Sequence, residues 1–130
     1  MYCEQVRSFT KACAEGELPN CPYELEVKDV DFISKMVNDE LIELKEAKGV
    51  VEQADALVDM IYYLCDAACK KGINLDPLFE IVHSANMDKV VDGKVIRRED
   101  GKILKPAGWK PPEPQLIACI EDQVTNGSFQ

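Results

Sequence analysis

Apolar residues recur every three or four positions through most of residues 1–90. This spacing places the apolar side chains on one face of an α-helix and is typical of amphipathic helices that pack onto a core. Gly16 and Gly72 are natural stops for such helices, and Asp76 followed by Pro77 is a typical N-cap and first helical residue. The pattern predicts four helices and a shorter last one, at about 2–15, 27–48, 50–71, 76–89 and 115–123.

The polarity pattern then changes. In VVDGKVIRREDGKILK two Asp-Gly pairs flank short β-prone runs, which is typical of a hairpin, here centred on residues 99–101. The following PAGWKPPEP has too many prolines for regular structure and predicts an extended strap. We therefore expect one domain over 1–130, an all-α bundle of four to five helices. Its core lies at about 27–90, and a small C-terminal β-hairpin and strap lie at about 91–114.

The composition is that of a globular protein, with 46% hydrophobic and 30% charged residues. No apolar run approaches the roughly eighteen residues that a membrane-spanning helix needs, and the N-terminal residues lack the apolar core of a secretory leader. The six cysteines include no CxxC pair, which favours reduced, partly buried thiols over a disulfide framework. We therefore expect a cytoplasmic protein with no membrane partner.

The net charge of −9 argues against a nucleic-acid partner, but the charge is unevenly distributed. Residues 1–88 hold 18 acidic and 8 basic residues, whereas residues 89–110 hold 3 acidic and 7 basic residues. A basic segment attached to an acidic helical body is either a solvated loop or a binding surface for an anion. Charge alone leaves both interpretations open.

Two stripes of acidic residues run along the second and third predicted helices. Glu40 and Glu43 share one helix face, and Glu52, Asp55 and Asp59 share another. Two such stripes can face each other across an antiparallel pair of helices and bring four or more carboxylate oxygens together. Mg²⁺ and Mn²⁺ prefer oxygen ligands of this kind. The alternative is that the acids lie on a wet face and bind nothing.

These residues carry a resemblance to a known family. Glu40-x-x-Glu43 followed by Glu52-x-x-Asp55 resembles the ExxE…ExxD metal signature of the MazG-like all-α nucleoside triphosphate pyrophosphohydrolases. The likeness is greatest to the branch of phosphoribosyl-ATP pyrophosphohydrolase and the dimeric dUTPases. EQADALVDMIYYLCDAACKKGINLDPLFEIVHSANMDK and REDGKILKPAGWKPP extend it over about residues 27–113. Only eight residues separate the two motifs, fewer than is usual in the family, so the turn between the helices must be tight.

The resemblance implies an enzyme that cleaves a nucleoside triphosphate between the α and β phosphates, with Mg²⁺ or Mn²⁺ as cofactor, and works as a homodimer or homotetramer. Housecleaning of the nucleotide pool or a dUTPase-like role would fit. The metal ligands would be Glu40, Glu43, Glu52 and Asp55, with Glu43 as general base. The candidate substrate contacts are Asn86, Lys89, Arg97, Arg98 and Lys105.

Each of these assignments has a plainer alternative. Asn86 and Lys89 would also suit an exposed helix end, where a lysine complements the helix dipole. The arginines fit phosphates well because of their planar guanidinium groups, but they would suit a hairpin surface equally. For the whole chain, the competing interpretation is a non-catalytic acidic helical module for dimerisation or other interactions.

Overall fold

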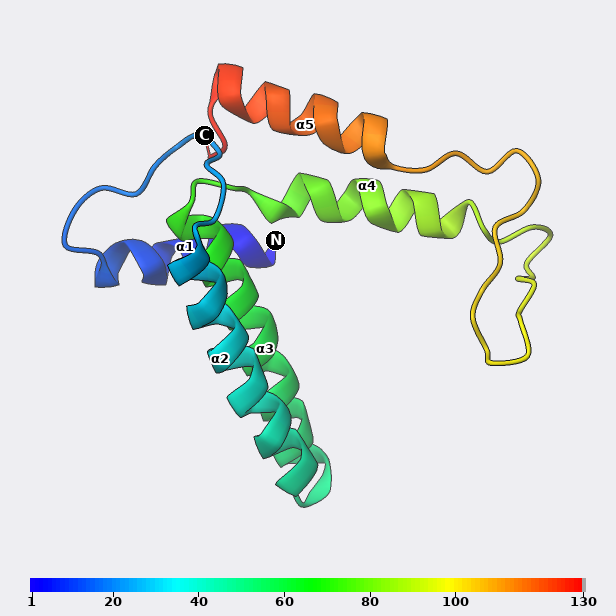
Figure 1. The fold of residues 1–130 in the computed structure, drawn as a ribbon, viewed down its shortest axis with the longest axis horizontal. Coiled ribbons are helices and arrows are strands. Elements are labelled where there is room, and N and C mark those ends of the chain that lie inside the picture. Colours follow the sequence, from blue (N-terminus) through cyan, green and yellow to red (C-terminus); the bar gives the residue numbers. More distant parts are fainter. Residues whose placement is uncertain (130) are drawn as a thin grey trace.

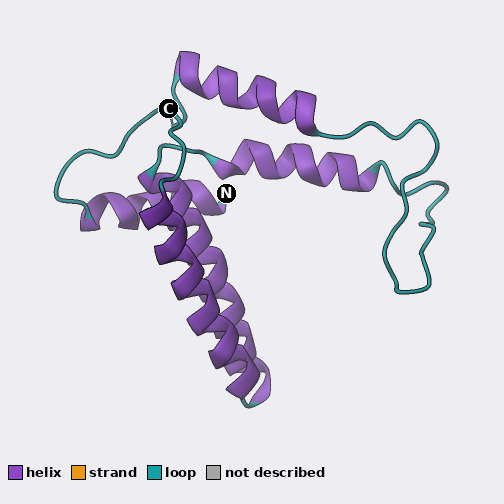
Figure 2. Ribbon diagram, in the orientation of Figure 1, coloured by secondary structure: helices purple, strands orange, loops and turns teal. Residues whose placement is uncertain are grey.

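The computed structural model describes residues 1–129, and helices make up most of it (Figures 1 and 2). Within these residues no strand forms, and the helices are α1 (Tyr2–Cys13), α2 (Val27–Glu46), α3 (Gly49–Lys70), α4 (Leu75–Met87) and α5 (Glu113–Asn126). The all-α prediction and the place of each helix are confirmed, with ends that differ by a few residues.

The start of α4 differs from the prediction in an informative way. Asn74, not Asp76, is the N-cap, and its side-chain oxygen accepts the backbone N–H of Asp76 at 3.0 Å. The Asp76 carboxylate instead accepts the backbone N–H groups of Cys3 and Glu4, at 2.9 and 3.0 Å. Asp76 therefore satisfies free N–H groups in the first turn of α1, a long-range role that local sequence does not reveal.

α2 and α3 form a long antiparallel hairpin that extends away from the rest of the molecule (Figure 1). Only Ala47 and Lys48 separate the two helices, as the short spacing between the acidic motifs requires. Gly49 starts α3 with a φ of 87°, a left-handed conformation that favours glycine. This tight turn fixes the register of the two helices.

The buried apolar cluster lies where α1 packs against the C-terminal part of α3, and it consists of Cys3, Val6, Cys65, Ala68 and Cys69. These are small side chains, so the core of one chain is small. Many larger apolar side chains stay exposed, including Val50 and Val51 of α3 at 76% and 78%.

α4 and α5 are antiparallel, contact each other, and diverge from the α2–α3 hairpin (Figures 1 and 2). They are joined by the segment 89–112, whose basic part, residues 89–110, is called the basic arm below. It projects beyond the ends of both helices (Figure 1).

The predicted β-hairpin of the basic arm is not formed as a pair of strands. The turn lies where the sequence places it, since the Gly101 N–H donates to the Arg98 carbonyl at 2.8 Å. The backbone pairing is limited to two isolated antiparallel bridges, Val91 with Lys94 and Arg97 with Ile103. A two-stranded ribbon without a third strand or a helix to cover it has little to stabilise it, and so the arm pairs only at these points.

None of the described helices is both long enough and apolar enough to cross a membrane.

Candidate metal centre

Three carboxylates converge between α2 and α3: those of Glu40, Glu43 and Asp59. One oxygen of each lies within 4.8 Å of the others. Glu40 and Glu43 occupy successive turns of α2, and the antiparallel packing brings Asp59 of α3 opposite them. Like charges at this distance repel, so the cluster is stable only if a proton or a cation offsets part of the charge.

Glu40 is the most enclosed member of this acidic cluster. Its side chain is 9% exposed, and its Oε2 atom has no hydrogen-bond partner among the described residues. Burial raises the pKa of Glu40 to about 7, and the neighbouring Glu43, Asp59 and Asp55 carboxylates add to the increase. Burial also raises the pKa of Asp59, again with contributions from Asp55 and Glu43.

The donor set fits a hard divalent cation. A buried carboxylate oxygen without a partner costs free energy, which a cation would recover. Carboxylate oxygens from two adjacent helices are the ligands that Mg²⁺ and Mn²⁺ prefer. The acidic cluster could therefore hold such an ion, with the open Oε2 of Glu40 as one ligand atom.

The other two predicted ligands, Glu52 and Asp55, lie beside this cluster, closer to the turn of the hairpin. Together with Glu43 they line a pocket of about 270 Å³. The Oε2 atom of Glu52 also accepts the backbone N–H of Lys48 at 2.6 Å, which ties this carboxylate to the start of α3. Glu43 is thus the residue shared by the cluster and the pocket.

Asp59 is the member of the cluster that the predicted ligand set leaves out. The sequence pattern places it on the acidic stripe of α3, four residues after Asp55 and therefore one turn further along the same face. The register of α2 against α3 decides which acids of the stripe meet Glu40, and the sequence motif does not contain that register. The four-residue spacing from Asp55 was the sequence signal that could have placed Asp59 in the ligand set.

The predicted substrate contacts form a second group, at the base of the basic arm and along it. Lys89 Nζ donates to the Asn86 side-chain oxygen at 3.0 Å, and Lys89 and Lys105 both lie over the ring of Trp109, at 5.2 and 4.9 Å from its centroid. The indole N–H of Trp109 donates to the Ala85 carbonyl at 2.7 Å. The structure therefore brings three of the predicted contacts together around one tryptophan.

The two arginines of this group differ in their partners. Arg97 donates to the Gly101 carbonyl at 3.0 Å and has no carboxylate partner among the described residues. Arg98 donates through Nε to the Asp100 carboxylate at 2.9 Å, and this contact raises the pKa of Arg98 and lowers that of Asp100. The charge of Arg98 is therefore largely offset within the arm.

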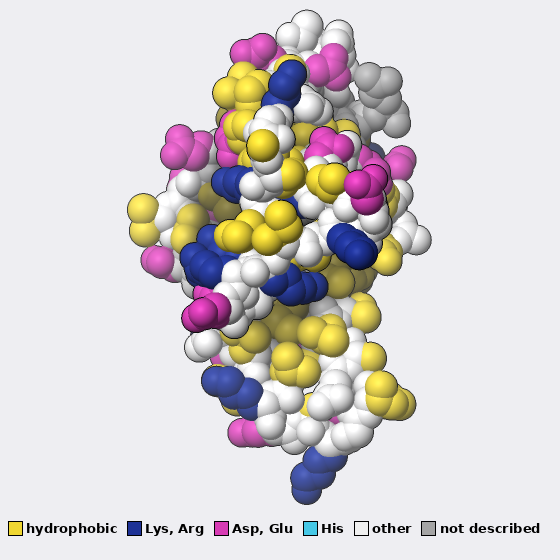
Figure 3. Space-filling model, turned by 90° about the vertical axis from the view of Figure 1, so that its right-hand side faces the viewer, with side chains coloured by type: hydrophobic (Ala, Val, Ile, Leu, Met, Phe, Trp, Pro, Cys, Tyr) yellow, Lys and Arg dark blue, Asp and Glu magenta, His cyan; other side chains and the backbone are white. Residues whose placement is uncertain are grey.

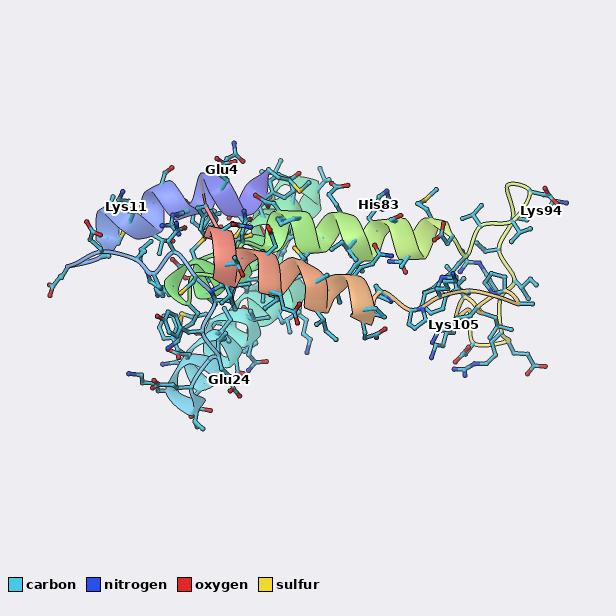
Figure 4. All side chains as sticks on the ribbon, turned by 90° about the horizontal axis from the view of Figure 1, so that it is seen from above. Glu4, Lys11, Glu24, His83, Lys94 and Lys105 are labelled. Carbon is cyan, nitrogen blue, oxygen red and sulfur yellow. The ribbon has the colours of Figure 1, made fainter. Side chains whose placement is uncertain are left out.

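Within one chain, the acidic cluster and the basic arm lie apart. The hairpin carries the carboxylates in one direction, and α4 carries the arm in another (Figure 1). Seen from above, Lys94 and Lys105 of the arm lie at the far end of the molecule, beyond α4 and α5 (Figure 4). His83 lies on α4 between these regions and belongs to neither group (Figure 4).

The model of the phosphoribosyl-ATP pyrophosphohydrolase family matches residues 9–86. No curated protein matches the chain. The matched range contains α2, α3 and the whole acidic cluster, and it ends before the basic arm. Since it covers more than half of the sequence, the chain belongs to the phosphoribosyl-ATP pyrophosphohydrolase family of the MazG-like superfamily, a membership that indicates a pyrophosphohydrolase acting on a nucleotide-like substrate.

Proposed function

We propose that the protein hydrolyses a nucleoside triphosphate to the monophosphate and pyrophosphate, with Mg²⁺ or Mn²⁺ as cofactor. The observation that carries this proposal is the buried Glu40 carboxylate, which faces Glu43 and Asp59 and has one oxygen without a partner in the described part of the chain. An interaction module would gain nothing from such an arrangement, because collecting acids in a partly buried place lowers stability. A cation-dependent hydrolase of phosphates needs it.

Glu40, Glu43 and Asp59 would hold the cation, and Asp55 and Glu52 would contribute from the pocket beside them. A divalent cation bound there supplies positive charge that attracts the phosphates and makes water a better acid. This also explains how a chain with a net charge of −9 accepts an anionic substrate.

Glu43 is our candidate for the general base, because it faces both the acidic cluster and the adjoining pocket. Its carboxylate would accept a proton from the attacking water as the water oxygen bonds to the α-phosphorus. The bond from the α-phosphorus to the bridging oxygen then breaks, and pyrophosphate leaves with that electron pair. Glu40, which is enclosed, would stay with the cation throughout.

The positive charge for the β and γ phosphates would come from Arg97, Arg98 and Lys105, and Asn86 and Lys89 would hold the base edge or a phosphate. Cations of this kind compensate the charge of the leaving pyrophosphate. We propose that the protein acts in the cytoplasm as a homodimer or homotetramer, without a nucleic-acid or membrane partner, in nucleotide-pool housecleaning or a dUTPase-like role.

The test is an assay of pyrophosphate release over a panel of canonical and modified nucleoside triphosphates, dUTP included, with Mg²⁺, with Mn²⁺ and with chelator. Phosphoribosyl-ATP belongs in the panel because the matched family is named for it. Triphosphate turnover that depends on the cation supports the proposal. Turnover of phosphoribosyl-ATP alone would reassign the substrate. No turnover, together with no site-specific cation binding in calorimetry, would favour the interaction module instead.

A further inference from the structure

Trp109 attaches the basic arm to the end of α4. The Lys89 N–H would donate to the Ala85 carbonyl if the helix continued, but it donates to the Asn86 carbonyl at 3.0 Å instead. The indole N–H of Trp109 takes its place and donates to the Ala85 carbonyl at 2.7 Å. Because Ala85 is buried, its carbonyl needs such a donor, and the hydrogen bond fixes the position of the indole ring.

A tight turn in the arm directs the same ring toward α4. The Trp109 backbone N–H donates to the Pro106 carbonyl at 3.1 Å, and Gly108, the third residue of this turn, has a φ of 79°. Turns that need a positive φ at this position favour glycine. The ring is therefore fixed twice, by the turn in its own segment and by its hydrogen bond to α4.

Two lysine ammonium groups lie over the Trp109 ring. The Nζ atoms of Lys89 and Lys105 are 5.2 and 4.9 Å from its centroid, within the range at which the negative face of an indole attracts a cation. Lys89 follows the end of α4 and Lys105 precedes the turn, so the ring gathers charges from two segments of the chain. In the described part of the chain neither lysine forms an ion pair with a carboxylate, and both charges remain available to an anion.

Asn86 adds neutral donors to this pair of charges. Its side-chain oxygen accepts Lys89 Nζ at 3.0 Å, and its amide nitrogen carries two further N–H groups. Among the residues that the structure describes, this nitrogen donates to no acceptor. Lys89, Lys105 and Asn86 therefore offer a ligand chiefly N–H donors, two of them charged. Phosphate oxygens complement such a set, because they are negative and each accepts several hydrogen bonds.

Other basic residues of the arm do not share this arrangement. Lys and Arg side chains are exposed on the face that the arm presents (Figure 3). Arg98 is already paired with Asp100. Lys94 lies farther out along the arm than Lys105 (Figure 4). The charges that the fold holds in place are thus those around Trp109, a smaller set than the charge of the arm suggests.

We propose that Trp109 is a positioning residue that assembles a binding site for a diphosphate or triphosphate group from Lys89, Lys105 and Asn86. A flexible lysine loses side-chain freedom when it binds a ligand, and this loss is smaller where the free protein already holds it. The ring holds both ammonium groups without neutralising them, as a carboxylate would. The inference rests on the proposed function for the role of the anion, which would be the β and γ phosphates of the triphosphate. It assigns Lys89 and Asn86 to a phosphate and not to the base edge.

Trp109 is the sole tryptophan of the chain, so its fluorescence reports directly on this site. Inorganic pyrophosphate is titrated into the protein in the presence of chelator. We expect a saturable change in wild type, and a Kd at least about tenfold higher in Lys89→Ala and in Lys105→Ala. Lys94→Ala removes the same charge elsewhere on the arm and should bind within about twofold of wild type. No saturable binding by wild type, or an equal loss in Lys94→Ala, would overturn the proposal.

Competition identifies the part of a nucleotide that the site binds. A nucleoside triphosphate should displace pyrophosphate in chelator, because it carries the same phosphate groups, and the corresponding nucleoside should not. A triphosphate that leaves pyrophosphate bound would overturn the proposal. So would a nucleoside that changes the fluorescence where pyrophosphate does not, because the ring would then stack on a base.

Substitutions of Trp109 separate positioning from simple attachment. Trp109→Phe keeps a ring for the two lysines but loses the indole N–H, and Trp109→Leu loses both. Calorimetry should show pyrophosphate binding at least about tenfold weaker in Trp109→Leu and mostly recovered in Trp109→Phe. Equal losses in the two variants would mean that Trp109 only attaches the arm, against the proposal. Circular dichroism spectra that match wild type exclude unfolding, and the lysine variants test the site with the attachment intact.

Binding in chelator and turnover with a cation can fail separately. If pyrophosphate binds as expected but no triphosphate is hydrolysed, the proposed function fails and the Trp109 site stands. If Lys105→Ala and Trp109→Leu hydrolyse triphosphates with the KM of wild type, the proposed function stands and the Trp109 site fails. In an active enzyme that uses the site, both variants raise KM, whereas Glu43→Gln lowers kcat.

Discussion

The middle of α3 and its C-terminal end differ in how their acidic residues are paired. Near its C-terminal end, Asp66 accepts the Thr10 hydroxyl at 2.5 Å through one carboxylate oxygen and Lys70 Nζ at 2.9 Å through the other. In the middle of α3, Asp59 faces Glu40 and Glu43, and the buried Glu40 has an oxygen with no partner among the described residues. Both acids lie on the same helix stripe, seven residues apart.

The comparison shows that acidic residues on one helix face can serve two purposes. Asp66 holds α1 to α3 next to the buried cysteine cluster, so it contributes to stability. Without a bound cation, the acidic cluster lowers the stability of the chain. Such an arrangement is typical of a ligand-binding site. The same residue type, in the same repeat, is satisfied in one place and left open in the other.

The largest expected effect is on activity. Glu40→Gln, Glu43→Gln, Glu52→Gln and Asp55→Asn should each lower kcat/KM for pyrophosphate release by about 100-fold or more, since even indirect partners of a metal site cost 10–100-fold. Asp66→Asn, on the satisfied part of the same stripe, is the control and should stay within about twofold of wild type. Wild-type rates in two of the four variants would contradict the assignment of the metal site.

The second effect is on the pH dependence of stability without metal. Because the pKa of Glu40 is raised to about 7 in the folded protein, folding favours its protonated form. The folded chain then binds more protons than the unfolded chain between the ordinary glutamate pKa and about pH 7, so stability falls as pH rises through that window. Urea denaturation in chelator should show this decline in wild type and a flatter profile in Glu40→Gln.

The sign of the change at high pH checks the same point. Above about pH 7.5, Glu40→Gln should be more stable than wild type in chelator, and Mg²⁺ or Mn²⁺ should stabilise wild type more than the variant. A variant that is less stable than wild type at every pH would show that Glu40 contributes to the fold as Asp66 does, and the contrast between the acidic cluster and Asp66 would disappear.

The third effect is at the satisfied end. Asp66→Ala leaves the buried Thr10 hydroxyl with only the Val6 carbonyl, at 3.2 Å, as an acceptor, and should cost about 0.5–1.5 kcal/mol in the free energy of unfolding. Thr10→Val combined with Asp66→Ala should cost less than the sum of the two single changes, because the cycle then removes both partners. Additive losses would mean that the hydrogen bond contributes nothing to stability. None of these changes should alter the catalytic rate.

Most of the fold could be predicted from the sequence, because helix periodicity is a local property. Gly72 follows the end of α3 as predicted, whereas α1 ends at Cys13, before the predicted stop at Gly16. α2 and α3 follow the apolar repeat, and the tight turn follows from the eight residues between Glu43 and Glu52. What local patterns do not contain is tertiary register. The N-cap role of Asn74 in place of Asp76, and the position of Asp59 in the cluster, both depend on which residues meet across helices.

The candidate site also combines features that local sequence patterns predict with features that depend on the tertiary arrangement. Glu40 and Glu43 could be found from their spacing, and they lie in the cluster. The group around Arg97 and Lys105 could be found from its charge, but its distance from the carboxylates could not, because that distance depends on the direction of α4. The pairing of Arg98 with Asp100 is local, but the sequence does not predict it. Side chains two residues apart in a turn have no fixed relative orientation.

The smallest effect should come from the turn that sets the register of the acidic half. Gly49 has a φ of 87°, and a Cβ there would meet no atom within 4 Å, so Gly49→Ala is strained by its backbone alone. The expected cost is about 1 kcal/mol in unfolding free energy, measured by urea denaturation. Because Gly49 follows Lys48, whose N–H donates to Glu52, kcat should fall by a few-fold at most if the helix register is kept.

Gly72→Ala is the contrasting change, just after the other end of α3. A Cβ there would clash with the Cys21 carbonyl oxygen, and the residue would also have to adopt a φ of 70°. It should lower stability more than Gly49→Ala and change kcat less. The reverse order, with Gly72→Ala damaging catalysis and Gly49→Ala damaging the fold, would mean that the acidic half of α3 serves stability and the buried half serves the site.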